Sequence, residues 1–382
     1  MSQCSATKNG FVMNTSGETN PCCSGKFAEY EIKDTTQWND KRNAEIPLYE
    51  LSKENWLIQC NMCRVAEAAK NMSPRIIDKH FYSTVAEDDN TIKSATINGS
   101  NTCNLMCRMC GPSPSSRWGQ LVRQNPYNEE YGIIKAVVKD ASSTLPMLKE
   151  KVLTKHLRKI TLAGGEPLLI KWYDDIVQYI VDKGYNKIKL GITTNGTTRL
   201  NKKWQSVYKS LDEGGIGFSI DGVGPVFEYI RAGATWDKLK DVVEHTQAVL
   251  KDHNGIEIQY TYVAQALNAH TMWNDMDYLS KWFRSYNRRS PVVIEENYQL
   301  CFEPPQQSYS VICPELRKKY NIEHITEAFK YTPELFKQFM QQMAWQDNAH
   351  DTNLKDINPD FFDTQYYPAE LINSYYTVRV EH

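Results

Sequence analysis

The sequence has 382 residues, of which 41% are hydrophobic and 24% are charged, and its formal net charge is -2. This length and composition are typical of a soluble protein with one large domain and a smaller appendage, and the near-neutral charge does not favour nucleic-acid binding. No apolar run approaches the roughly 20 residues of a membrane helix, and residues 1–10 lack the pattern of a signal peptide. We therefore expect a cytoplasmic protein with no membrane partner and no nucleic-acid partner.

The chain divides into three zones, which we predict to be separate domains. Residues 1–88 are irregular, contain a predicted hairpin that extends through Gly17, and carry five cysteines. Residues 89–310 alternate strand and helix signals. Residues 311–382 form a polar, aromatic-rich extension with two predicted helices, one beginning at Pro314, with proline at an early position, and one at 333–344.

The central zone has the pattern of an α/β protein. Short apolar and β-branched runs that end in turn residues predict strands at 94–99, 159–163, 188–193, 216–220, 256–263 and 292–295. Helical periodicity predicts helices at 170–181, 236–250 and 271–283. Strands that alternate with helices predict a parallel sheet with right-handed crossovers. In α/β barrels the chemistry lies at the carboxyl ends of such strands.

Cysteines are grouped near the start of the chain, since eight of the ten lie in residues 1–110. A reducing cytosol disfavours a disulfide framework, so this grouping indicates metal or cluster ligation. Cys301 and Cys313 stand apart, and they are as readily explained as buried apolar residues.

A CxxxCxxC motif formed by Cys103, Cys107 and Cys110 follows the first central strand. Three thiolates can bind three irons of a [4Fe-4S] cluster, which normally takes four, so one iron would stay open to another ligand. The alternative is a zinc site, which prefers four closed ligands.

A second motif, Gly164-Gly165-Glu166-Pro167, follows the next strand. Two glycines allow a ligand to approach the backbone closely, and the carboxylate could accept hydrogen bonds from a ligand amine. The alternative is a plain glycine turn that ends a strand.

The order of these motifs resembles the radical S-adenosylmethionine (SAM) superfamily over about residues 90–305. Residues 193–196 (TTNG) are similar to the family's third-strand motif, residues 219–222 (SIDG) to its fourth-strand motif, and Arg231 to the arginine that follows in the peptide-modifying branch. The resemblance implies a partial (β/α)6 barrel. The chain departs from the family at Met109, where an aromatic residue usually packs near the SAM adenine.

The resemblance implies that the cysteine triad holds a [4Fe-4S] cluster and that SAM binds at its open iron. The GGEP residues are then expected at the methionine amino group of SAM, the third- and fourth-strand residues at its ribose and carboxylate, and the arginine at its carboxylate, although a solvated helix residue is the alternative for the arginine. The residues assigned to SAM in this way are Gly164, Gly165, Glu166, Thr194, Asn195, Ser219 and Arg231.

The cysteines of the first zone resemble the ligands of a SPASM or twitch auxiliary-cluster domain, which in most relatives follows the barrel instead of preceding it. This resemblance implies an auxiliary [4Fe-4S] cluster with full thiolate ligation and a role in electron transfer. A four-cysteine zinc knuckle is the alternative, and Cys23 rivals Cys22 as a ligand. The expected ligands are Cys4, Cys22, Cys60 and Cys63.

The function that follows from the resemblance is reductive cleavage of SAM to a 5′-deoxyadenosyl radical, which abstracts hydrogen from a peptide or protein substrate. An electron donor such as flavodoxin or ferredoxin is expected. Two alternatives stay open: a radical SAM enzyme that acts on a small molecule or nucleotide, and a zinc-binding interaction protein on an inactive barrel.

Overall fold

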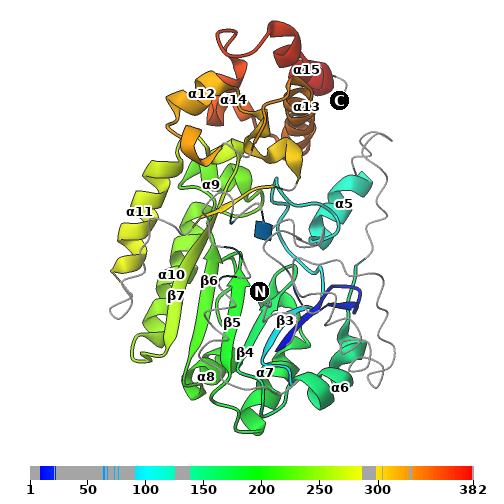
Figure 1. The fold of residues 1–382 in the computed structure, drawn as a ribbon, viewed down its shortest axis with the longest axis vertical. Coiled ribbons are helices and arrows are strands. Elements are labelled where there is room, and N and C mark those ends of the chain that lie inside the picture. The colour runs from blue at the N-terminus through cyan, green and yellow to red at the C-terminus, as the bar shows by residue number, and fades with distance from the viewer. Residues whose placement is uncertain are drawn as a thin grey trace.

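A computed structural model describes residues 9–20, 22, 63–64, 67, 73, 76, 91–124, 138–285, 298–302, 304–326 and 329–380. An eight-stranded sheet of order β2-β1-β3-β4-β5-β6-β7-β8 forms its centre (Figure 1). The strands are β1 (Gly10–Met13), β2 (Thr19–Asn20), β3 (Ser94–Asn98), β4 (Lys159–Ala163), β5 (Lys189–Thr194), β6 (Gly214–Ser219), β7 (Ile256–Ala264) and β8 (Tyr298–Leu300).

Strands β3 to β8 are parallel and lie side by side in chain order, and the described strands do not close into a barrel. This confirms the predicted α/β class and the partial barrel. The ends of the first five strands agree with the sequence prediction to within two residues. The predicted sixth strand, 292–295, lies outside the described residues, and β8 is the sixth strand of the series from β3 to β8.

The hairpin predicted near the amino terminus is present, and it extends the central sheet. β1 pairs antiparallel with β2 and parallel with β3. Asn14 stabilises the turn, because its side-chain oxygen accepts hydrogen bonds from the backbone N–H groups of Ser16 and Glu18. Residues 10–20, placed by prediction in an amino-terminal cluster domain, therefore hydrogen-bond to the sheet of the second domain. The domain boundary at 88/89 stays a prediction.

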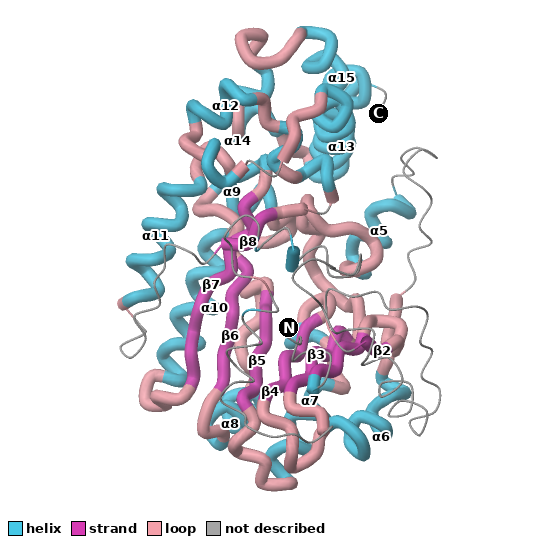
Figure 2. The backbone as a smooth tube through the Cα atoms, viewed as in Figure 1, coloured by secondary structure: helices cyan, strands magenta, loops and turns pink. Residues whose placement is uncertain are grey.

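Amphipathic helices connect the parallel strands (Figure 2). In α7, residues 173, 176, 177 and 180 are buried, which is the spacing of one helical face. Helix α8, which the sequence analysis missed, begins after Asn201, whose side chain caps the N–H of Trp204. The helices of this region are α5 (Ser116–Gln124), α6 (Leu145–Met147), α7 (Tyr173–Asp182), α8 (Lys202–Ser210), α9 (Pro225–Ile230), α10 (Trp236–Leu250) and α11 (Met272–Arg284).

The described residues from 313 to 380 form a helical region at one end of the sheet, where α13 and α15 pack together (Figure 1). Its core is aromatic: the rings of Phe336 and Tyr367 stack with centroids 3.7 Å apart, and Phe361 packs beside both. The helices are α12 (Pro314–Lys319), α13 (Pro333–His350), α14 (Leu354–Ile357) and α15 (Ala369–Val380). Among the described residues no helix is both long and apolar enough to cross a membrane.

Candidate functional site

The three cysteines of the motif lie on a loop, residues 103–110, that follows β3; we call it the triad loop. Cys107 is buried, and Cys103 and Cys110 are half-buried. The indole N–H of Trp118 donates a hydrogen bond to the carbonyl of Cys107 at 2.8 Å. Helix α5, which carries this tryptophan, thus supports the middle of the loop.

The backbone of the triad loop is hydrogen-bonded to the segment that follows α9. The N–H of Met106 donates to the carbonyl of Ala232 at 2.9 Å, and the N–H of Arg108 donates to that of Ile230 at 2.8 Å. These two hydrogen bonds connect the loop to the residues on either side of the predicted SAM contact Arg231, which follows β6 and lies 124 residues from Cys107 in sequence.

Two N–H donors face the sulfur atoms of the triad. A guanidinium nitrogen of Arg231 lies 3.8 Å from Sγ of Cys107, and the amide nitrogen of Asn195 lies 3.8 Å from Sγ of Cys103. Hydrogen bonds to sulfur stabilise thiolates and tune the potential of iron–sulfur clusters. This donor set fits a thiolate-ligated cluster.

The three thiols of the loop differ in pKa, because their electrostatic surroundings differ. A hydrogen bond from the Cys110 thiol, aided by the positive charge of Arg231, lowers the pKa of Cys107 to about 7. The same hydrogen bond, together with burial, raises the pKa of Cys110. Burial raises the pKa of Cys103. Cys107 is thus the thiol that ionises most readily among the three.

The described residues contain no group of three His, Cys, Asp or Glu side chains that converge on a single metal ion. A zinc site requires such convergence, whereas each thiolate of a cubane binds a different iron. The thiols of Cys107 and Cys110 are hydrogen-bonded to each other, and the three cysteines of this short loop would each bind one iron of a cubane.

Glycines allow the loop after β4 to pack directly on the loop after β3. A Cβ atom on Gly165 would lie 2.2 Å from the carbonyl oxygen of Thr102, and one on Gly164, whose φ is +120°, would lie 2.5 Å from that of Ser100. Backbone N–H groups of Gly165 and Glu166 donate across this contact, each at 2.8 Å. The two glycines thus permit the close approach of residues 100–102, which lead into the triad loop.

Glu166 is fully buried and connects the ends of β4 and β5. Its carboxylate accepts hydrogen bonds from Oγ1 of Thr194 at 2.8 Å, from the N–H of Asn195 at 2.7 Å and from the N–H of Leu168 at 3.2 Å. Burial raises its pKa, and these donors oppose that shift. A carboxylate has about four acceptor positions, so one position is left for a ligand amine.

Arg231 forms a buried ion pair with Asp221, with 2.6 Å between guanidinium nitrogen and carboxylate oxygen. The other oxygen of Asp221 accepts from the N–H of Val263 at 2.9 Å, which fixes the carboxylate on β7. Burial lowers the pKa of Arg231, but Asp221 and the triad thiols outweigh it and the net shift is upward. Nε of Arg231 is buried without a hydrogen-bond partner.

Met109, the residue at which the motif departs from its family, is half-buried and packs on the core. Its sulfur lies 3.8 Å from the amide nitrogen of Gln265, and the amide oxygen of Gln265 is buried without a hydrogen-bond partner. Ser219 is half-buried at the last position of β6. Met109 follows β3 and Gln265 follows β7, so all three residues lie at the carboxyl ends of strands.

The structure thus brings the predicted central residues into one region, although their assigned contacts with cofactors stay predictions. The amino-terminal ligand set is different: Cys4, Cys23 and Cys60 lie outside the described residues. Cys22 is half-buried and Cys63 is buried. The auxiliary cluster stays a prediction.

Residues 97–264 match the profile of the Radical SAM superfamily. The chain contains a radical SAM domain. Members of this superfamily use a [4Fe-4S] cluster and SAM, which agrees with the donor set of the triad loop.

Three curated relatives share part of the radical SAM domain. GTP 3′,8-cyclase of Campylobacter fetus is 26% identical over 62% of this chain and 66% of its own length. A probable GTP 3′,8-cyclase of Methanococcus maripaludis is 27% identical over 40% and 45%, and an S-adenosylmethionine-dependent nucleotide dehydratase of Selenomonas ruminantium is 32% identical over 29% and 40%. The chain therefore spans between 40% and 66% of the length of these relatives.

Solved structures with a radical SAM fold are similar at low sequence identity. The anSMEcpe structure with bound AdoMet and Cp18Cys peptide is 15% identical, with 67% of this chain and 59% of that chain covered and a TM-score of 0.37. Streptococcus suis SuiB bound to the precursor peptide SuiA is 11% identical, with 89% and 66% covered and a TM-score of 0.31.

Sequence reasoning missed three residues of this site: Arg108, Asp221 and Gln265. Asp221 belongs to the SIDG motif, so the motif itself was the available signal. Arg108 is a charged residue inside a loop whose neighbours are apolar, which is a signal of a buried ion pair. No local pattern distinguishes Gln265, because its position beside Met109 comes from a contact between residues 156 apart in the sequence.

Proposed function

We propose that this chain is a radical SAM enzyme whose Cys103, Cys107 and Cys110 hold a [4Fe-4S] cluster. The observation that carries the proposal is the triad loop itself: three thiols, with Arg231 and Asn195 donors facing two of them, at the carboxyl edge of the parallel strands β3 to β8.

In this proposal the residues of the protein bind and orient SAM. When bound, the cluster supplies the electron that cleaves SAM reductively and so yields a 5′-deoxyadenosyl radical. Glu166 offers its remaining acceptor position to the methionine amino group, and Thr194 and Asn195 orient this carboxylate. Arg231, held by Asp221, offers its unpartnered Nε to a carboxylate. Ser219 faces the same edge from β6.

The proposed substrate is a peptide or protein, and an auxiliary [4Fe-4S] cluster on Cys4, Cys22, Cys60 and Cys63 serves electron transfer. A donor such as flavodoxin or ferredoxin supplies electrons. This choice rests on the resemblance of the first zone to a SPASM or twitch domain. A nucleotide substrate is the second candidate, and the names of the curated relatives favour it.

The cofactor proposal is tested by anaerobic reconstitution of the full chain. We expect about four irons per chain from the triad, or about eight if the auxiliary cluster forms, and release of 5′-deoxyadenosine from SAM on reduction. Cys107→Ala should abolish this release, since it removes a ligand. Cys313→Ala, at a buried cysteine in the carboxyl-terminal region, is the control and should retain it. Zinc in place of iron, or undiminished release by Cys107→Ala, would contradict the proposal.

The substrate proposal is tested separately with the reduced, reconstituted enzyme. One reaction receives GTP, and another receives synthetic peptides translated from the reading frames beside its gene. A peptide mass change that depends on SAM supports the first candidate. Conversion of GTP that depends on SAM supports the second and excludes the first for this chain.

A further inference from the structure

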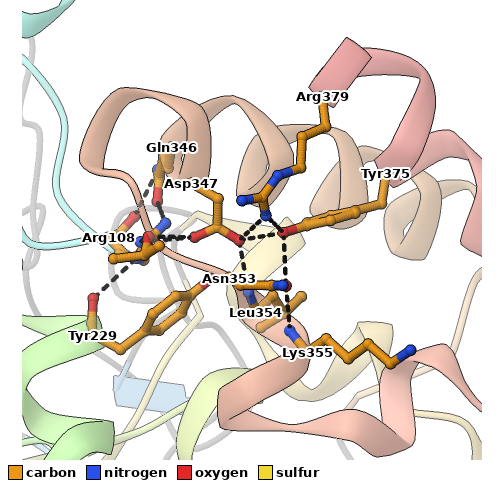
Figure 3. Close-up of polar contacts among 10 residues, drawn as sticks. Arg108, Tyr229, Gln346, Asp347, Asn353, Leu354, Lys355, Tyr375 and Arg379 are labelled. Carbon is orange, nitrogen blue, oxygen red and sulfur yellow. Dashed lines mark hydrogen bonds and ion pairs between the residues drawn. The ribbon is translucent and has the colours of Figure 1, made fainter.

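The triad loop is held from its far side by the carboxyl-terminal helical region. Two residues of α13, Gln346 and Asp347, contact Arg108 of the loop (Figure 3). The residue before them, Trp345, stacks on Trp118 of α5. These α13 residues lie about 240 residues from the loop in sequence, outside the part of the chain that matches the radical SAM profile.

Gln346 and Asp347 both contact Arg108, which lies between the second and third cysteines of the motif. Its side chain is fully buried and pairs with Asp347, with 2.9 Å between nitrogen and oxygen, and the carboxylate is fully buried as well. Nε donates to the carbonyl of Tyr229 at 2.9 Å, and the guanidinium lies over the ring of that tyrosine, 3.7 Å from its centroid. The other nitrogens donate to Gln346 at 3.3 Å and to Thr352 at 2.6 Å. The guanidinium has one orientation that satisfies all of these contacts.

Asp347 is itself fixed by the turn after α13 and by α15. Thr352 donates to one carboxylate oxygen at 2.7 Å, and the N–H of Leu354 and the hydroxyl of Tyr375 donate to the other at 2.7 and 2.5 Å (Figure 3). The turn is possible because Asp351 ends α13 in the left-handed conformation, with φ at 52°. Donors from the turn, from α14 and from α15 therefore converge on one carboxylate of α13.

The same region also holds the backbone of the loop. The carbonyl of Arg108 accepts hydrogen bonds from the side-chain amides of Gln346, at 3.3 Å, and of Gln307. Trp345 stacks on Trp118, with centroids 5.6 Å apart, and Trp118 donates to the carbonyl of Cys107. The carbonyl of Arg108 is thus held by α13 and by Gln307, and that of Cys107 by Trp118, on which α13 packs.

We propose that Asp347 is a positioning residue for the triad loop, acting through Arg108 to fix the spacing of the Cys107 and Cys110 thiolates and to balance the buried positive charge beside the cluster. The inference rests on the proposed function, because it assumes a cluster at the triad. Removing one partner of a buried ion pair is strongly destabilising, because the other charge is left buried without compensation. We therefore expect loss of Asp347 to destabilise the conformation of the triad loop, which carries Arg108.

The first test uses the cluster-free full chain and hydrogen exchange of residues 103–110. In Asp347→Asn the side-chain size is kept and the ion pair is lost, so we expect exchange in the loop to rise at least tenfold. The control is Asp360→Asn, which removes another ion pair of the same helical region, to Lys319 at 2.7 Å, and contacts nothing in the loop. Equal exchange in both variants overturns the inference.

A milder variant covers the case in which Asp347→Asn does not fold. Tyr375→Phe removes one donor to Asp347 and keeps both charges. We expect a smaller rise in exchange of the same loop residues. Wild-type exchange in this variant, measured with wild-type folding, overturns the inference.

The second test measures the midpoint potential of the reconstituted cluster. Reduction adds negative charge, so Asp347→Asn, which leaves Arg108 uncompensated, should raise the potential, and Arg108→Gln should lower it. The double variant should return toward the wild-type value, a pattern that general destabilisation does not produce. Shifts of the same sign, or none, overturn the inference. A wild-type chain that binds no cluster overturns the proposed function instead, which keeps the two failures distinct.

Discussion

Glu166 shows how one side chain organises the site at the scale of a residue. Its carboxylate has no solvent exposure, and its three donors come from Leu168 on one loop and from Thr194 and Asn195 on the next. The amide side chain of Asn195 in turn reaches Asn104 at 3.0 Å and the sulfur of Cys103. A residue predicted as a direct SAM contact is thus also the link between β4, β5 and the triad loop.

We expect Glu166→Gln to reduce the free energy of unfolding by about 1–3 kcal/mol, because a side-chain NH2 group must then face a backbone or hydroxyl donor and leave it unsatisfied. Chemical denaturation of the cluster-free chain measures this change. Glu244→Gln, on the exposed face of α10, is the matched control and should stay within about 0.5 kcal/mol of wild type. Equal stability of the two variants would show that Glu166 does not link the loops.

At the scale of elements, the site depends on two loops whose backbones touch. The loop after β4 lies against residues 100–102, and its glycines leave no room for a side chain. The contact sets the starting point of the triad loop, because Cys103 follows Thr102 directly.

Gly165→Ala should therefore displace the triad loop, since its Cβ would lie 2.2 Å from the carbonyl oxygen of Thr102. We expect a loss of at least 1–3 kcal/mol in stability, as for other overpacked sites, and less iron bound per chain after reconstitution. Gly111→Ala is the control, because no atom lies within 4 Å of the added Cβ. Wild-type iron content in Gly165→Ala would contradict this account.

At the scale of the whole molecule, a half-buried histidine couples the sheet region to the carboxyl-terminal region. His270, just before α11, lies 3.3 Å from the side-chain nitrogen of Asn358 and packs near the ring of Tyr320. Burial lowers the pKa of His270 to about 4, although Asp360 opposes the shift. The contact between the two regions therefore depends on a neutral imidazole.

The pH dependence follows from this shift. The unfolded chain binds a proton on His270 at about pH 6.5, whereas the folded chain binds it only near pH 4, so acidification through this window lowers stability. The contribution of His270 reaches about 3 kcal/mol at pH 4. His270→Gln should give a flatter curve of melting temperature against pH between 6.5 and 4.5. His324→Gln, at an exposed histidine, should follow the wild-type curve, and a wild-type slope in His270→Gln would contradict this assignment.

Local patterns predicted most of the central fold, because each strand is a short apolar and β-branched run that can be recognised without its neighbours. The strand runs end in turn residues such as Gly164 and Gly196, and both glycines have positive φ. Helix α8 was missed, because its apolar residues, Trp204, Val207 and Tyr208, are few among polar ones. The attachment of β1 to β3 was also missed, because strand pairing across 80 residues leaves no local signal.

The sequence by itself determined the cysteine triad, the GGEP motif and their order after successive strands, since these depend on residue type and short spacing. Only the tertiary structure decided what surrounds them: that Glu166 accepts from Thr194 and that Arg108 pairs with Asp347. Each of these contacts joins distant segments, and the energy that selects them, burial of a charge with its partner, exists only when the chain is folded. For the triad, therefore, the sequence determines the residue types and their spacing, and the fold determines the contacts that hold the loop in place.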